Sequence, residues 1–227
     1  MTMQIYFHET LDPVPQPGAH TRYLSQLGEI VHRQGNAEGS AGGELIAMWV
    51  PIFLTGRWPQ MVSLWQAPGS WDGFASHFDN NDELFHRPLE RWYGERSGGF
   101  DRILVGTDYT PTRQAMLAQQ RQAPVVLQQT VRLPAGGATG YLSQLGDASA
   151  RIGRDHEFGL LGAYEVAFRN GTEAMVLWAF PNVRLLAQAE ARPTDFPHWA
   201  DWVRQSREHE QEHVGVVLRP TSWSFVR

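Results

Sequence analysis

The stretch Tyr23-Leu-Ser-Gln-Leu-Gly-Glu29 occurs twice in this chain of 227 residues, the second time as Tyr141-Leu-Ser-Gln-Leu-Gly-Asp147. Chance does not place two such strings in one sequence, so they predict an internal repeat. In both strings the tyrosine and the leucines recur at helical spacing, which indicates helices over residues 21–34 and 139–153. The repeat decides the fold, because one structural unit is predicted to occur twice.

Outward from each string, the same kinds of segment follow in the same order. An apolar run typical of a strand precedes each helix, and two further strands, a second helix and a short closing strand come after it. Asn170-Gly171, between two apolar runs, is the strongest hairpin signal. The predicted elements are first strands at 5–9 and 125–131, second strands carrying Trp49 and Tyr164, third strands ending at Trp65 and Trp178, second helices at 82–96 and 196–212, and closing strands at 104–105 and 217–218.

This order is β-α-β-β-α-β in each half, which is the ferredoxin-like plan. The predicted fold class is therefore α+β, with two tandem ferredoxin-like units at residues 1–110 and 124–227. Residues 111–123 are polar and end before a proline, so they are predicted to connect the units. The repeat also makes Trp49 and Glu165 near-equivalent positions of the second strands.

The composition excludes several classes of protein. An apolar fraction of 42% is enough for a packed core, and the absence of cysteine excludes disulfides and thiol chemistry. All 19 basic residues are arginine, which excludes the reactions that need a lysine amine. A net charge of −5 with interspersed signs argues against nucleic acid as a partner. No membrane-length apolar run or targeting signal occurs, so we expect a cytoplasmic protein with no membrane partner.

Four motifs follow one another in the second half: Leu133-Pro-Ala-Gly136, Gly162-Ala-Tyr164, Leu177-Trp178 and Val217-Leu-Arg-Pro-Thr221. In this order they resemble the NIPSNAP-type family of the dimeric α/β-barrel superfamily. The first half matches in its third strand, up to Trp65, and departs in the longer turn at residues 11–18. The resemblance implies two ferredoxin-like units packed sheet against sheet, with helices outside, as a fused form of the barrel that single-unit relatives make by dimerising.

The stretch His209-Glu-Gln-Glu-His213 contains the H-E-x-x-H spacing of zinc proteases. Such a site needs a third ligand downstream, and residues 214–227 contain no histidine, aspartate or glutamate. Charged neighbours indicate a solvated helix face at the end of the second helix of the second half. We therefore expect no metal site.

Three side chains are candidates for acid–base chemistry: His8, His77 and Glu165. A strand glutamate in an apolar pocket would have a raised pKa, and a histidine titrates near neutral pH. Each also has a structural or solvent-facing alternative, which the sequence leaves open. Five aromatic residues are candidates for binding a substrate, although repeated tryptophans also suit a repeated core: Tyr6, Trp49, Trp65, Tyr164 and Trp178.

The sequence favours a cofactor-independent enzyme that acts by proton transfer on a hydrophobic aromatic or polycyclic small molecule, as an isomerase, cyclase or lyase. A non-catalytic small-molecule binding or scaffold protein is the first alternative. The resemblance adds two others, a cofactor-free monooxygenase and a heme-binding protein, and the fold does not choose among them. Whether the chain forms a homo-oligomer is left open.

Overall fold

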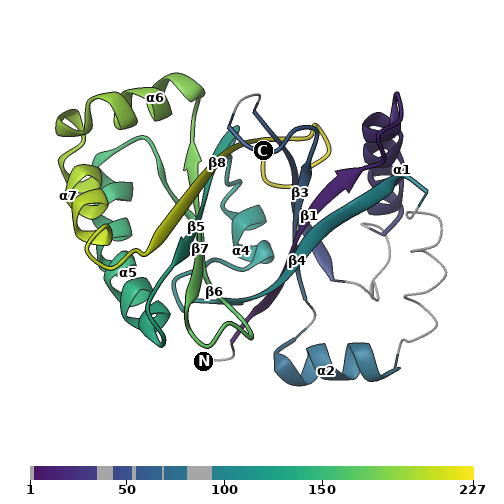
Figure 1. The fold of residues 1–227 in the computed structure, drawn as a ribbon, viewed down its shortest axis with the longest axis horizontal. Helices are drawn as coiled ribbons and strands as arrows, with labels where there is room; N and C mark the ends of the chain where they lie inside the picture. The colour runs from purple at the N-terminus through teal and green to yellow at the C-terminus, as the bar shows by residue number, and fades with distance from the viewer. Residues whose placement is uncertain (1–2, 35–42, 53–54, 68, 81–93) are drawn as a thin grey trace.

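The computed structural model describes residues 3–34, 43–52, 55–67, 69–80 and 94–227, and their strands form one closed barrel (Figure 1). The strands are β1 (Ile5–Pro13), β2 (Glu44–Pro51), β3 (Met61–Gln66), β4 (Arg96–Gly106), β5 (Val125–Arg132), β6 (Gly159–Val166), β7 (Glu173–Phe180) and β8 (Glu212–Pro220). The helices are α1 (Ala19–Gln34), α2 (Trp71–Asn80), α4 (Arg113–Ala118), α5 (Gly137–Asp155), α6 (Val183–Ala191) and α7 (Pro197–Ser206), with a 3₁₀ turn at Pro193–Asp195.

Neighbouring strands are antiparallel around the barrel, in the order β1-β3-β2-β8-β5-β7-β6-β4. Residues 5–106 supply the adjacent strands β4-β1-β3-β2, and residues 125–220 supply β8-β5-β7-β6. The two sets join where β2 pairs with β8 and where β4 pairs with β6. Each set has two outer strands, and both pair with an outer strand of the other set, so the closed barrel has no exposed sheet edges.

Helices cover the barrel on two sides. Figure 1 shows α1 and α2 on one side, α5, α6 and α7 on the other, and α4 between them. Met116 of α4 is fully buried among inward-facing strand residues, so α4 packs against the barrel interior. Among the described residues, no helix is long and apolar enough to cross a membrane.

Strand side chains alternate between the barrel interior and the helix layers, as the pleat requires. The inward-facing strand residues form one buried cluster: Tyr6, Ile46, Trp49, Val62, Leu64, Leu104, Val126, Leu161, Tyr164, Val166, Met175, Leu177 and Leu218. Tyr23 of α1 and Tyr141 of α5 belong to two separate clusters under the helices of their own halves. The repeated string therefore anchors an equivalent helix to each half of the barrel.

The second half differs from the prediction at its second helix. In place of one helix over 196–212, the structure has α6, a 3₁₀ turn and α7, which ends at Ser206. The charged residues from Glu212 onward belong to β8, because they pair with β5, where Arg132 lies opposite Glu212 and Val131 opposite His213. Strand pairing therefore decides the structure of this segment, although its charge pattern is typical of an exposed helix.

The first half differs at the same place. The predicted helix at 82–96 lies mostly outside the described residues, while residues 71–80 form α2 and Arg96 begins β4. The closing strand is much longer than 104–105, because residues 96–103 also pair with β1. The predicted connector contains a helix, α4, which Thr112 caps by accepting a hydrogen bond from the backbone N–H of Ala115.

Replacing Gly99 with alanine should lower the free energy of unfolding by about 1–3 kcal/mol. Gly99 lies in β4 with φ +149°, and an added Cβ would collide with the carbonyl oxygen of Thr10. Gly98→Ala is the matched control, since the nearest atom to its added Cβ is 3.7 Å away, on Asp12. Urea unfolding of both variants tests this, and equal stabilities would contradict it.

Candidate functional site

His8 lies at the centre of the barrel. Its side chain is fully buried, and its Nε2 makes a 2.9 Å hydrogen bond with Oε1 of Gln128, on β5. Four steps separate β1 from β5 in the strand order, so this bond crosses the interior. Burial lowers the pKa of His8 to about 4 against the opposing effect of the Gln128 bond, and the charge of Arg102 lowers it further. The imidazole is therefore neutral near pH 7 and bridges opposite walls.

Three of the predicted binding residues share this interior. Tyr6 and Tyr164 meet edge to face with ring centroids 5.0 Å apart, and Trp49 belongs to the same buried cluster. Burial raises the pKa of Tyr6 to about 12 and that of Tyr164 well above its usual value, so both phenols stay protonated. All three side chains have 0% exposure, as does His8. The structure gathers these four residues, but without access from solvent.

Trp65 and Trp178 lie on the other face of the sheet, under the helices. The indole N–H of Trp178 donates to Oε1 of Gln129 (2.9 Å), and that of Trp65 donates to Oε2 of Glu9 (2.9 Å). Both tryptophans pack with the helix-side clusters of their halves. The five predicted aromatic residues therefore do not line one common pocket, because strand alternation sends these two away from the barrel interior.

Glu9 is the functional candidate that the sequence analysis missed. Its Oε2 accepts hydrogen bonds from Ser63 Oγ (2.7 Å) and Trp65 Nε1 (2.9 Å), and none of the described hydrogen bonds involves Oε1. Burial raises the pKa of Glu9, and the nearby carboxylate of Asp101, opposite it on β4, adds to the rise. The bonds from Ser63 and Trp65 and the charge of Arg96 only partly oppose this. Glu9 is thus a partly buried carboxyl with one oxygen available to take a proton.

The second half carries an amide at the matching place. Phe7 pairs with Trp65 and Leu127 pairs with Trp178, so Glu9 and Gln129, each two residues further along, correspond. Gln129 accepts the same indole hydrogen bond without a charge. The bond to tryptophan is common to both halves, but the ionisable group is present in the first half alone.

Glu165 does not join either group. It follows Tyr164 on β6 and so points to the opposite face, away from the barrel interior, and it is partly exposed. The sequence matched Glu165 with Trp49, and this match is wrong. Trp49 lies opposite Val62 and Tyr164 lies opposite Met175, and these two partners each stand three residues before the tryptophan of the third strand. Trp49 and Tyr164 also both face inward. The counterpart of Trp49 is therefore Tyr164. A register shift of one residue exchanges the two faces of a strand.

His77 lies in α2 rather than in the loop that the sequence indicated. Its side chain lies outside the described part of the structure, so its candidacy as an acid–base group stays a prediction.

The H-E-x-x-H stretch does not form a metal-binding helix. α7 ends at Ser206, and His213 lies in β8 with its Nδ1 3.0 Å from Oε2 of Glu210. Within the described ranges, no three His, Asp or Glu side chains gather as metal ligands. His8, the fully buried one of the described histidines, uses its Nε2 to bond Gln128, and the heme alternative stays a prediction.

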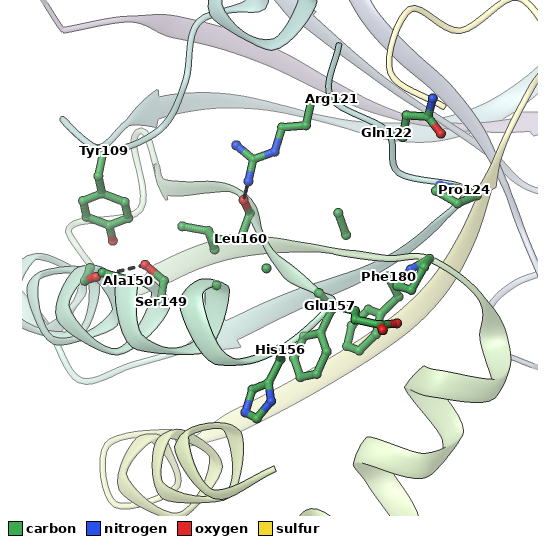
Figure 2. A pocket seen from close by; sticks show the side chains of 16 residues that line it. Tyr109, Arg121, Gln122, Pro124, Ser149, Ala150, His156, Glu157, Leu160 and Phe180 are labelled. Atoms are coloured by element: carbon green, nitrogen blue, oxygen red, sulfur yellow. Dashed lines mark hydrogen bonds between the residues drawn. The ribbon is translucent and has the colours of Figure 1, made fainter. Parts of the chain in front are cut away.

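A surface pocket of about 710 Å³ lies outside the barrel on the second half (Figure 2). Its walls come from α5, from residues 156–160 around the start of β6, and from the segment 121–124 that precedes β5. None of the predicted site residues lines it, and neither does Glu9. The pocket and the face around Glu9 are therefore separate places on the described part of the chain.

No protein-family model matches the chain, and no curated protein matches it, so the NIPSNAP-type resemblance stays a prediction. Solved structures do match. An anthrone oxidase-like protein has a TM-score of 0.64 at 11% identity, over 96% of this chain and 91% of that one. A proposed monooxygenase from Fusobacterium nucleatum has a TM-score of 0.61 at 9% identity, over 96% and 93%. A chlorite dismutase variant from Candidatus Nitrospira defluvii has a TM-score of 0.57 at 9% identity, over 98% and 96%. The chain thus has the mixed α+β fold of the dimeric α/β-barrel proteins.

Proposed function

We propose that this protein is a cofactor-independent enzyme that removes a proton from a hydrophobic aromatic small molecule bound on the helix-facing side of β1 and β3. The observation that carries the proposal is the carboxyl of Glu9, which is partly buried, has a raised pKa and keeps its Oε1 out of every hydrogen bond among the described residues. A base is most effective when its pKa approaches the working pH, and burial moves the pKa of Glu9 in that direction. Glu9 replaces His8 as the proposed base.

The surroundings of Glu9 suit an aromatic substrate. Phe7 and Trp65 lie opposite each other on neighbouring strands and on the same face as Glu9. Burial raises the pKa of Tyr23 of α1, and the nearby charge of Glu9 adds to the rise. Aromatic side chains of this kind bind flat apolar molecules, while Ser63 and Trp65 hold the carboxylate in a fixed orientation.

The reaction after proton removal is proposed to be oxidation by O₂. The neighbours in fold include proteins named as a monooxygenase and as anthrone oxidase-like, which favours this alternative over isomerisation, cyclisation or elimination. With anthrone as the substrate, loss of a proton from the methylene carbon leaves an anion that O₂ oxidises. One oxygen atom becomes the new carbonyl of anthraquinone, and the other leaves as water with the two methylene hydrogens.

We also propose that the barrel consists of two tandem ferredoxin-like units, at residues 1–110 and 124–227. The strand orders β4-β1-β3-β2 and β8-β5-β7-β6 support this, since each follows the same path through its own half. The repeated bond from Trp65 to Glu9 and from Trp178 to Gln129 supports it as well. A tandem origin explains how one half keeps a structural amide while the other carries an ionisable carboxyl.

The purified protein should consume one O₂ for each anthrone and form one anthraquinone, faster than a protein-free blank at pH 7 by at least the roughly 10²-fold that a general base supplies. Oxygen-electrode and absorbance traces measure the two together. Prior treatment with EDTA should leave the rate unchanged, because the proposed base is a side chain. Anthrone that quenches tryptophan fluorescence without being consumed would instead favour the non-catalytic binding protein.

A further inference from the structure

The pocket on the second half has the size and shape of a small-molecule site. Its volume of about 710 Å³ lies within the range of roughly 300–1,000 Å³ for ligand sites. One wall is the face of α5 that carries Ala150 and Gly153, and an added Cβ at Gly153 would meet no atom within 4 Å, so the space there is open. Figure 2 shows this wall facing the segment with Arg121 and Pro124.

Arg121 supplies a positive charge to this pocket. Its Nη2 donates a hydrogen bond to the carbonyl oxygen of Leu160, which is a neutral partner. Among the described residues, no carboxylate forms an ion pair with Arg121. Arg121 is partly buried, and burial lowers its pKa, because a charged guanidinium loses solvation free energy there. An anionic ligand gains the most binding free energy beside a partly buried cation that has no counter-ion.

The other polar groups leave the space beside Arg121 to a ligand. Glu157 also lines the pocket, but Figure 2 shows its carboxylate well apart from Arg121, with Leu160 drawn between them. Tyr109 donates its hydroxyl to the carbonyl oxygen of Leu142. The only described negative charge of the pocket is therefore set apart from the guanidinium.

Apart from Gln122 and Ser149, most of the remaining lining is apolar or aromatic. His156 stacks on Phe158 with ring centroids 5.2 Å apart and planes 9° apart, and Phe158 stacks on Phe180 at 4.4 Å. Nε2 of His156 is buried and has no hydrogen-bond partner in the described structure. Phe158 and Phe180 are 3% and 1% exposed, so their stacked rings belong to the core behind the pocket surface, and Arg121 is the one cation among the described lining residues.

We propose that this pocket binds a small aromatic carboxylate, with the carboxylate on Arg121 and the ring against the α5 face at Ala150 and Gly153. This site is separate from Glu9 and does not depend on the proposed reaction. Arginine pairs with carboxylates through parallel N–H donors, which fixes the orientation of the acid, and the small residues of α5 admit the ring.

The probe is 1-naphthoate, titrated into the wild-type protein by isothermal calorimetry. We expect saturable binding at one site per chain with a Kd below about 1 mM. Arg121→Gln should weaken it by about tenfold to a hundredfold, the range for loss of a hydrogen bond to a charged group. Arg151→Gln, an exposed arginine of α5 outside the pocket, is the matched control and should leave Kd unchanged. 1-Naphthamide, which lacks the charge, should bind more weakly by a similar factor.

A second pair of variants tests the location without touching Arg121. An added Cβ at Gly153 or at Gly140 meets no atom within 4 Å, and both glycines are exposed on α5, but Gly153 alone lines the pocket. Gly153→Leu should abolish binding with no loss of melting temperature, while Gly140→Leu should bind as the wild type does. Absence of saturable binding, equal affinity for naphthamide, or full binding by Gly153→Leu would each overturn the proposal.

Discussion

Glu9→Gln should lower the rate of anthrone oxidation by roughly 10²–10⁴-fold, the usual contribution of a general base, while the protein keeps its fold. The amide can still accept the indole N–H of Trp65, as Gln129 does for Trp178 in the second half. It has no carboxylate oxygen with which to take a proton. Turnover per folded molecule measures the loss, and circular dichroism with a thermal melt confirms that the barrel is intact.

The second half supplies the matched control for this variant. Gln129→Glu places a carboxyl at the corresponding position, where Trp178 is fully buried. We expect a lower melting temperature, because a charge is buried without a partner, and an unchanged turnover per folded molecule. If Glu9→Gln kept full turnover, or if both variants lost turnover equally, Glu9 would not be the base.

Acidification should destabilise the protein through His8. In the unfolded chain the imidazole takes up a proton near its ordinary pKa of 6.5, whereas in the folded barrel burial delays this to about pH 4. Between these values the unfolded state binds more protons, so the free energy of unfolding falls as the pH is lowered. The loss amounts to about 3 kcal/mol by pH 4. Urea unfolding at pH 7 and at pH 4.5 measures most of it.

His8→Gln isolates this contribution from the other titrating groups. The amide can still bond with Gln128 across the barrel, but it does not titrate. The stability of the variant should therefore depend less steeply on pH below 6.5 than that of the wild type. Equal pH dependence in the two proteins would show that His8 is not held neutral by the interior. Turnover per folded molecule at pH 7 should be nearly unchanged, in contrast to Glu9→Gln.

Local patterns predicted the elements whose own sequence carries the signal. The strings that begin at Tyr23 and Tyr141 form α1 and α5, and Asn170-Gly171 forms the hairpin turn, with φ of 52° and 63°. Pairing between strands that are far apart in the sequence decided the structure of the remaining segments. Glu212 joins β8 because β5 offers a partner for it, although its neighbours resemble an exposed helix.

The candidate site was harder to predict because it depends on which face a strand residue occupies. His8 and Glu9 are neighbours in the sequence, yet one lies at the barrel centre and the other lies under the helices. The segment at residues 11–18, whose first three residues extend β1, obscured the alignment of the first strands, so the match between Glu9 and Gln129 could not be read from the repeat. With the strand register known, alternation alone assigns Glu9 to the same face as Trp65.

The dependence of kcat/KM on pH tests the central claim most directly, because kcat/KM for anthrone reports the ionisation of the free enzyme's base. The wild type should lose activity on the acid side with a midpoint above the ordinary glutamate pKa of 4.5, since burial raises the pKa of Glu9. In Glu9→Gln the residual activity should show no such acid limb. A wild-type profile without an acid limb, or the same limb in both proteins, would contradict the assignment of Glu9 as the base.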